Sequence, residues 1–210
     1  MTNQLTSSLT IDDASYRVTK ADPHPIFHPD MLGIKVSSIG TFCWAGYIVS
    51  YECKDGQLFA RSMTLGVFDD DPLVNGVKPD PLPKPDDPAY AFILGRSYTD
   101  VWLPLDYSGE VILGKDWVGN LGRGNHGSAP AVEYNDVKKV VFLEGRLQKI
   151  TDISEQYVAE RQALIEQEEE KREKQWSIEE RKRRRVRFKR KVLEFFTRKK
   201  QPMATHRDGF

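Results

Sequence analysis

Apolar and polar positions alternate most clearly in CWAGYIVSYECKDGQLFARSMTL, residues 43–65. Tyr47, Val49, Tyr51 and Cys53 occupy every second position, which is the period of a β-strand. Asp55-Gly56 then supplies the two residues that a type I′ turn needs at positive φ. We therefore predict a β-hairpin whose second strand is Leu58–Leu65.

Weaker strand patterns lie on both sides of this hairpin. LTIDDASYRVTK, residues 9–20, predicts a hairpin that turns at Asp13-Ala14, and MLGIKVSSI, residues 31–39, predicts a strand. DVWLPLDYSGEVILG, residues 100–114, places Val101, Leu103 and Leu105 on one face. Gly109 indicates a bulge or bend within that stretch. VKKVVFLEGRLQKI, residues 137–150, predicts a hairpin around Glu144-Gly145.

Short apolar strands at close spacing, with few helical patterns between them, are typical of an antiparallel sheet. We expect a mainly β domain over residues 8–150, folded as a compact antiparallel barrel or sandwich. Residues 66–89 hold six of the twelve prolines and six aspartates, so we expect an extended, solvated loop insertion there. Residues 117–134 read as a glycine-rich connection.

The periodicity changes at Asp152. Ser154 is a candidate N-cap, with Tyr157 and Leu164 near the first face of a helix. Acid-first pairs at i,i+4 then support an exposed helix, each by a few tenths of a kcal/mol: Glu168 with Arg172, Glu170 with Lys174, Glu179 with Arg183, and Glu180 with Arg184. No apolar heptad persists, which disfavours a long coiled coil. We expect a charged helical extension over 152–200 and a flexible tail over 201–210.

The formal net charge of zero conceals an asymmetry along the chain. Residues 1–150 hold 14 basic and 19 acidic side chains, whereas residues 151–210 hold 17 basic and 12 acidic side chains. The stretch RKRRRVRFKRKVLEFFTRKK, residues 181–200, contains twelve basic residues and one acid, Glu194. An acidic body with a basic end indicates a polyanion or an anionic membrane as the partner.

As a helix, residues 186–196 would place phenylalanines and aliphatic residues opposite a basic face. That composition suits a membrane surface or an acidic groove of a partner protein, and the polybasic start suits a phosphate backbone. In the alternative interpretation, the apolar side chains pack on another chain, including a second copy, and the charge is merely solvated. The predicted contacts to an anionic partner are Arg181, Lys182, Arg183, Arg184, Arg185, Arg187, Lys189, Arg190 and Lys191, and the predicted apolar anchors are Phe188, Phe195 and Phe196.

Signals for catalysis or a cofactor are weak. Gly122-x-Gly124-x-x-Gly127 matches the dinucleotide expression, but Ser128-Ala129-Pro130 follows it and no βαβ unit surrounds it. Arg123 and His126 could instead serve a binding loop. The aspartates of the 66–89 segment lack the spacing of a calcium loop. We expect no catalytic residue and no cofactor.

Metal binding is the other chemistry to weigh. His24 and His28 lie in DPHPIFHPD, residues 22–30, where three prolines disfavour a shared helix face. We expect loop histidines and no metal site. A hydrolase or metal enzyme built on His24, His28 and His126 is the enzymatic alternative.

The sequence also bears on location. No run of 18 apolar residues exists, so we expect no membrane-spanning helix. The first residues lack a charged segment followed by an apolar one, so we expect no secretory signal. Cys43 and Cys53 fit two thiols in a reducing compartment. We predict a cytoplasmic protein that is membrane-peripheral if its helix binds lipid.

The stretches FCWAGYIVSYECKDGQLF, DYSGEVILG and VVFLEGRLQKI carry a resemblance. They are similar to a group of small uncharacterised bacterial all-β proteins with a Cys-Trp-x-Gly-Tyr strand, an Asp-Gly hairpin and a Ser-Gly bend. The resemblance covers about residues 38–150 and rests on Trp44, Gly46, Tyr47, Asp55, Gly56, Ser108 and Gly109. It implies an all-β body and no particular activity. The chain departs from the group in its 66–98 insertion and its long helix.

Two functions follow as hypotheses. The first is a non-enzymatic interaction module whose basic amphipathic C-terminal helix docks on an anionic partner, either nucleic acid or a membrane surface. The alternative is a bacterial defence or toxin-neutralising protein that binds one specific protein through its β domain. In that alternative, the helix would serve assembly.

Overall fold

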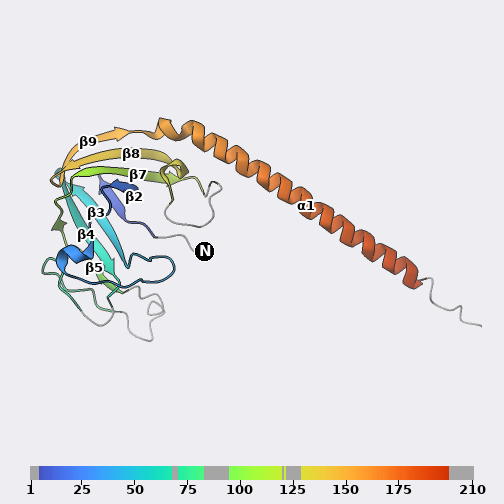
Figure 1. Cartoon of the computed structure of the whole chain (residues 1–210), viewed down its shortest axis with the longest axis horizontal. Coiled ribbons are helices and arrows are strands. Elements are labelled where there is room, and N and C mark those ends of the chain that lie inside the picture. The colour runs from blue at the N-terminus through green and yellow to red at the C-terminus, as the bar shows by residue number, and fades with distance from the viewer. Residues whose placement is uncertain (1–4, 68–70, 83–94, 120, 122–128, 199–210) are drawn as a thin grey trace, which may run out of the picture. The chain divides into compact units, whose positions relative to one another are not determined.

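The computed structural model describes residues 5–67, 71–82, 95–119, 121 and 129–198, with the side chains of 188 and 190–198 outside the description (Figure 1). The chain divides into two compact units, Met1–Leu164 and Ile165–Phe210. The first unit contains the strands and the first turns of the C-terminal helix, and the second contains the rest of that helix.

The described strands of the first unit form one nine-stranded sheet. The strands are β1 (Ser8–Ile11), β2 (Ala14–Asp22), β3 (Tyr47–Lys54), β4 (Gln57–Leu65), β5 (Arg96–Tyr98), β6 (Leu103–Pro104), β7 (Gly109–Trp117), β8 (Tyr134–Leu143) and β9 (Arg146–Asp152). Their order is β3-β1-β2-β7-β8-β9-β4-β5, with β6 paired to β4. Among these pairings, only that of β1 with β3 is parallel.

The sheet curves into a ring without forming a barrel (Figure 1). Strand β3 also pairs with β4, which joins the first strand of this order to the next-to-last one. The ring is weakest between β4 and β9, which share a single pair, Gln57 with Arg146. The prediction of a mainly β fold followed by a charged helix is therefore confirmed, with an incompletely joined ring in place of a barrel or sandwich.

The core fills the inner face of the sheet, as period-two alternation requires. Leu58, Ala60, Met63 and Leu65 of β4 are buried. The alternation changes phase between Ala60 and Met63 because Arg61 is an extra residue, a bulge opposite Ser50 and Tyr51. Each fully buried aliphatic side chain contributes about 1.5–3 kcal/mol. This burial is the main source of stability of the β domain.

The strong hairpin predictions are confirmed. Asp55 and Gly56 have φ of 51° and 74°, and Glu144 and Gly145 have φ of 49° and 70°. The first hairpin was predicted to turn at Asp13-Ala14, which is wrong by one residue. Asp12 and Asp13 have φ of 48° and 61°, and Ala14 already pairs with Ile11. Aspartate tolerates the left-handed region better than alanine does, which explains the difference.

Two other local predictions need correction. Residues 31–39 form no strand: the 3₁₀-helix η1 (Pro29–Leu32) takes the first two positions, Gly33 caps it with φ of 70°, and residues 34–39 lie in no helix or strand. Of residues 101–105, only Leu103-Pro104 is a strand. Gly109 is the first residue of β7, where an added Cβ would lie 2.3 Å from the carbonyl oxygen of Asp22. Close packing of two backbones therefore explains this glycine.

The 66–89 segment is not wholly solvated in its described part, residues 66–67 and 71–82. Val74 is fully buried, and it forms a bridge with Val77 around Asn75-Gly76. The Asn75 side-chain amide donates to the carbonyl oxygen of Val101 at 2.9 Å. This segment therefore contributes to the core. Residues 68–70 and 83–89 lie outside the described residues.

A 3₁₀-turn, η4 (Ser154–Tyr157), leads into α1 (Val158–Arg198). The expected N-cap at Ser154 is wrong, since Ile153 takes the cap position. Three expected ion pairs form in α1, with N–O distances of 3.1 Å for Glu170–Lys174, 3.9 Å for Glu179–Arg183 and 2.6 Å for Glu180–Arg184. Glu168 pairs with Lys171 at 2.8 Å, and no contact with Arg172 is found within the described residues. The tail, 201–210, lies outside the described residues.

Candidate functional site: the basic part of α1 and the helix root

The predicted basic residues that can be described are all exposed on α1. These are Arg181, Lys182, Arg183, Arg184, Arg185, Arg187 and Lys189. Arg183 and Arg184 pair with Glu179 and Glu180. The other five have no acidic partner within the described part of the chain. We call residues 181–189 the basic segment.

The basic segment presents charge on every side of the helix. Successive residues in an α-helix are about 100° apart, so the five consecutive cations from Arg181 to Arg185 surround the axis. The exposed apolar residues do not gather on one face. Trp176, Ile178 and Val186 are 67%, 51% and 67% exposed, and they are spread over about 160° around the axis, with Val186 about 80° from each of the other two. The basic segment is therefore cationic around the whole helix axis, with Lys182 between the exposed Ile178 and Val186.

Five residues that were predicted to contact the partner have side chains outside the description. The side chains of Arg190 and Lys191, and of the anchors Phe188, Phe195 and Phe196, lie outside the described residues, although α1 continues through all five positions. The amphipathic face predicted for 186–196 therefore stays a prediction.

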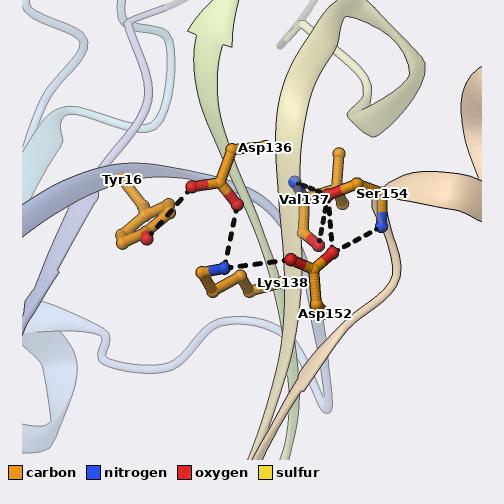
Figure 2. Close-up of polar contacts among 6 residues, drawn as sticks. All are labelled: Tyr16, Asp136, Val137, Lys138, Asp152 and Ser154. Atoms are coloured by element: carbon orange, nitrogen blue, oxygen red, sulfur yellow. Dashed lines mark hydrogen bonds and ion pairs between the residues drawn. The ribbon is translucent and has the colours of Figure 1, made fainter.

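The helix begins at a polar cluster, the helix root, in which strands β2, β8 and β9 meet η4 (Figure 2). The Tyr16 hydroxyl donates to Asp136 Oδ2 at 3.2 Å. Lys138 Nζ lies 3.1 Å from Asp136 Oδ1 and 3.3 Å from Asp152 Oδ2. Asp152 Oδ1 accepts from the backbone N–H of Ser154 at 2.9 Å and from its hydroxyl at 2.7 Å. A continuous chain of contacts thus joins β2 to the turn before α1.

The Ser154 side chain also bonds to strand β8. Its hydroxyl oxygen accepts from the backbone N–H of Val137 at 2.9 Å, and Val137 O lies 3.4 Å from the same hydroxyl. Val137 is fully buried and packs with Tyr134, Ile153 and Tyr157. Ser154 was predicted to cap the helix, whereas it ties η4 to β8.

The electrostatics of the helix root are those of a structural clamp. Hydrogen bonds from Ser154 lower the pKa of Asp152 to about 2. The hydrogen bond to Asp136 raises the pKa of Lys138, and burial raises the pKa of Tyr16. Such a carboxylate is a weak base near neutral pH, and such an ammonium does not lose its proton there. The cluster therefore holds charges in place and offers no activated nucleophile.

Arg161 completes the attachment of α1 in the first unit. This side chain is only 9% exposed. Its guanidinium donates to the carbonyl oxygens of Val132 and Tyr134 and to Asn135 Oδ1. These acceptors lie in and beside η3 (Ala131–Glu133) and at the start of β8. The sequence analysis did not identify Arg161 as an attachment residue. The one feature that could have indicated this role is its position four residues after Tyr157, on the same helix face.

The buried Glu133 is a second charged residue that the sequence did not reveal. It is 3% exposed. Its two carboxylate oxygens accept from the Trp117 indole N–H and from the backbone N–H of Leu121, both at 3.2 Å. Glu133 thus fixes the beginning of the glycine-rich connection. The glycines 122, 124 and 127, with Arg123 and His126, lie outside the described residues.

The two described histidines do not meet in a metal site. His28 Nδ1 accepts from the backbone N–H of Asp30 at 3.2 Å, and its ring packs edge-on against Tyr47. His24 lines a cavity of about 270 Å³ together with Cys43. Among the described residues, no group of three histidine, cysteine or acidic side chains could hold a metal ion.

Both cysteines are free thiols. Cys43 is buried, and its thiol donates to the carbonyl oxygen of Tyr47 at 3.4 Å. Cys53 is half-buried, and burial raises the pKa of its thiol. A thiol with a raised pKa is a poor nucleophile.

Within the described residues, no helix combines the length and apolar content that crossing a membrane needs.

No family model, curated protein or solved structure matches this chain. The resemblance to small bacterial all-β proteins therefore stays a prediction.

Proposed function

We propose that the protein is a non-enzymatic interaction module whose C-terminal helix binds an anionic partner, and that this partner is the phosphate backbone of nucleic acid. The observation that carries the proposal is the basic segment of α1. Seven of its cations are exposed, and five of them have no acidic partner within the described residues. Unpaired arginines are well suited to bind phosphate oxygens.

The arrangement of charge favours nucleic acid over a membrane. A membrane-surface helix needs an apolar face that inserts and a polar face that stays in water. In the part of α1 with described side chains, the exposed Trp176, Ile178 and Val186 are spread over about 160°, and cations surround the axis over residues 181–185. A helix in a groove of a duplex meets phosphates on more than one side. Charge all around the helix suits that environment.

The dimensions also fit. Residues 181–189 span about 12 Å at about 1.5 Å per residue. A duplex carries one negative charge per about 1.7 Å of its axis, hence about seven charges over that length. The basic segment has seven described cations.

Free thiols at Cys43 and Cys53 support the accompanying proposal of a cytoplasmic location.

The test is fluorescence anisotropy of a random-sequence 20-base-pair duplex with the full chain over a range of salt. The variant R181Q/R185Q/R187Q removes three cations that lack acidic partners. Each lost phosphate contact should reduce the slope of log K against log salt by about 0.9, so we expect a reduction of about 2–3. The matched control, K171Q/R172Q/K174Q, removes the same charge from the acidic part of α1 and should bind nearly as the wild type.

Three outcomes would contradict the proposal. An equal loss in the control would mean that net charge alone matters. Binding to phosphatidylserine vesicles that needs Phe195 and Phe196 and resists salt would make the partner a membrane. Binding to neither surface would shift the function to the β domain, as in the defence or toxin-neutralising hypothesis.

A further inference from the structure

Helix α1 is divided into two oppositely charged parts. Residues 165–180 hold seven acidic and three basic side chains, a net charge of −4. Residues 181–198 hold ten basic side chains and one acid, a net charge of +9. We call residues 165–180 the acidic segment. It directly precedes the basic segment on the same continuous helix.

The two segments cannot neutralise each other within one chain. A continuous α-helix separates residues by about 1.5 Å per position, so its side chains reach only three or four residues along it. The described pairs that cross the boundary are Glu179–Arg183 and Glu180–Arg184. Glu169 and Glu173 are exposed and have no basic partner within the described residues. Water and salt ions balance these exposed charges in the single chain, and the charges stay open to a partner of opposite charge.

We propose that two copies of the chain pair antiparallel through α1. In an antiparallel pair, the acidic segment of each copy lies against the basic segment of the other. A parallel pair would instead place like charges side by side, which is destabilising. The antiparallel arrangement also opposes the two helix dipoles. Charge complementarity therefore favours a second copy of α1 as the partner, and it favours the antiparallel orientation.

The exposed apolar residues select the register. Ile178 is 51% exposed and Val186 is 67% exposed. They lie on either side of Lys182, each about 40° from it around the axis. Crossing the two helices at Lys182 places Ile178 of each copy opposite Val186 of the other, and it places the two Lys182 side chains beside each other at the crossing point. The same register places Glu179 opposite Arg185, whereas Glu180 and Arg184 lie about 160° from Lys182 and keep their contact within one helix.

The interface holds little apolar surface, so attraction between charges dominates it. Exposed charge pairs are screened by salt, and we expect the dimer constant to weaken at least about tenfold between about 0.05 M and about 0.5 M salt. Where the proposed function holds, dimer and nucleic acid compete for the same cations. The acidic segment then acts as a built-in competitor for phosphate.

The test is disulfide cross-linking of full-length variants at low salt, with the wild-type chain as the blank for Cys43 and Cys53. A disulfide forms only when the two Cβ atoms come within about 4.5 Å. K182C lies on the crossing point and should cross-link to itself. Q175C and K189C should each fail alone and cross-link when mixed, because they face each other only in the antiparallel register.

The outcomes are distinct. Self-linking of Q175C as strong as that of K182C would mean a parallel pair and would overturn the proposal. A monomer by sedimentation at low salt, with no K182C cross-link, would also overturn it. Added 20-base-pair duplex should reduce the K182C cross-link. A cross-link that persists with a duplex that does not bind would retain the dimer and reject the proposed function.

Discussion

The β domain and α1 are stabilised by different forces. In the β domain, Val49, Leu58 and Val111 are fully buried. Between residues 165 and 187 of α1, no residue is buried, and the described contacts are local ion pairs. Substitutions in the first region should therefore change stability, whereas substitutions in the second should change binding and leave the unfolding of the β domain intact.

The largest expected effect is in the core. Phe142 is 2% exposed, whereas its neighbour Leu143 is 55% exposed. Phe142→Ala should lower the free energy of unfolding by about 3–5 kcal/mol, because it removes buried surface and leaves a cavity. Leu143→Ala should change it by less than about 0.5 kcal/mol. Urea unfolding measures both, and equal losses would contradict the packing described here.

The next effect is at Arg161, which attaches the first turns of α1 to η3 and β8. Arg161→Met leaves the carbonyl oxygens of Val132 and Tyr134 without their donor. Unpaired buried acceptors cost about 1–3 kcal/mol. Hydrogen exchange of residues 158–164 should become faster. Arg172→Met, at an exposed position of the same helix, is the control, and faster exchange in that variant would refute a specific role for Arg161.

A smaller effect should depend on pH. The pKa of Asp152 is lowered from 3.8 to about 2 by Ser154, so this carboxylate adds stability above about pH 4 that disappears as the pH falls towards 2. Asp152→Asn should lower Tm at neutral pH, and the difference from wild type should vanish near pH 2. Asp106→Asn, at an exposed carboxylate with no ion pair among the described residues, should show no such convergence.

The smallest effect is within α1. Glu180→Gln removes the 2.6 Å pair with Arg184 and should cost about 0.2–0.5 kcal/mol of helix stability at low salt. Circular dichroism should detect slightly less helix, and the urea midpoint of the β domain should not move. Glu169→Gln is the matched control. A shifted β-domain midpoint in Glu180→Gln would break the separation between the two regions.

Local features of the fold could be predicted from the sequence where local chemistry decides them. Asp55, Gly56 and Gly145 have positive φ, which glycine, asparagine and aspartate accept more readily than other residues do, and Glu144 adopts it next to Gly145. The charged pairs of α1 are likewise local. The strand predicted for 31–39 failed because Pro29 begins a 3₁₀-turn that alternation alone does not reveal.

Long-range features could not be predicted in this way. The parallel pairing of β1 with β3 joins Leu9 to Tyr51, and nothing in either strand specifies it. Val74 is buried although it lies in a segment rich in proline and aspartate. The helix root also depends on residues from three strands. For the candidate site, the exposed cations followed from composition, whereas the attachment through Arg161 required the packed structure.

The order of strands also sets when the sheet can form during synthesis. Val18 of β2 pairs with Leu113 of β7, and the ribosome needs about 5–20 s to make the residues between them. Strand β3 is synthesised before β7, so β1 can pair with β3 earlier. Strands β1 to β4 can therefore assemble while one edge of β2 is still unpaired. The polar cluster before α1 needs β8 and β9. The nascent chain should therefore anchor its cationic helix last, after the ring of strands is complete.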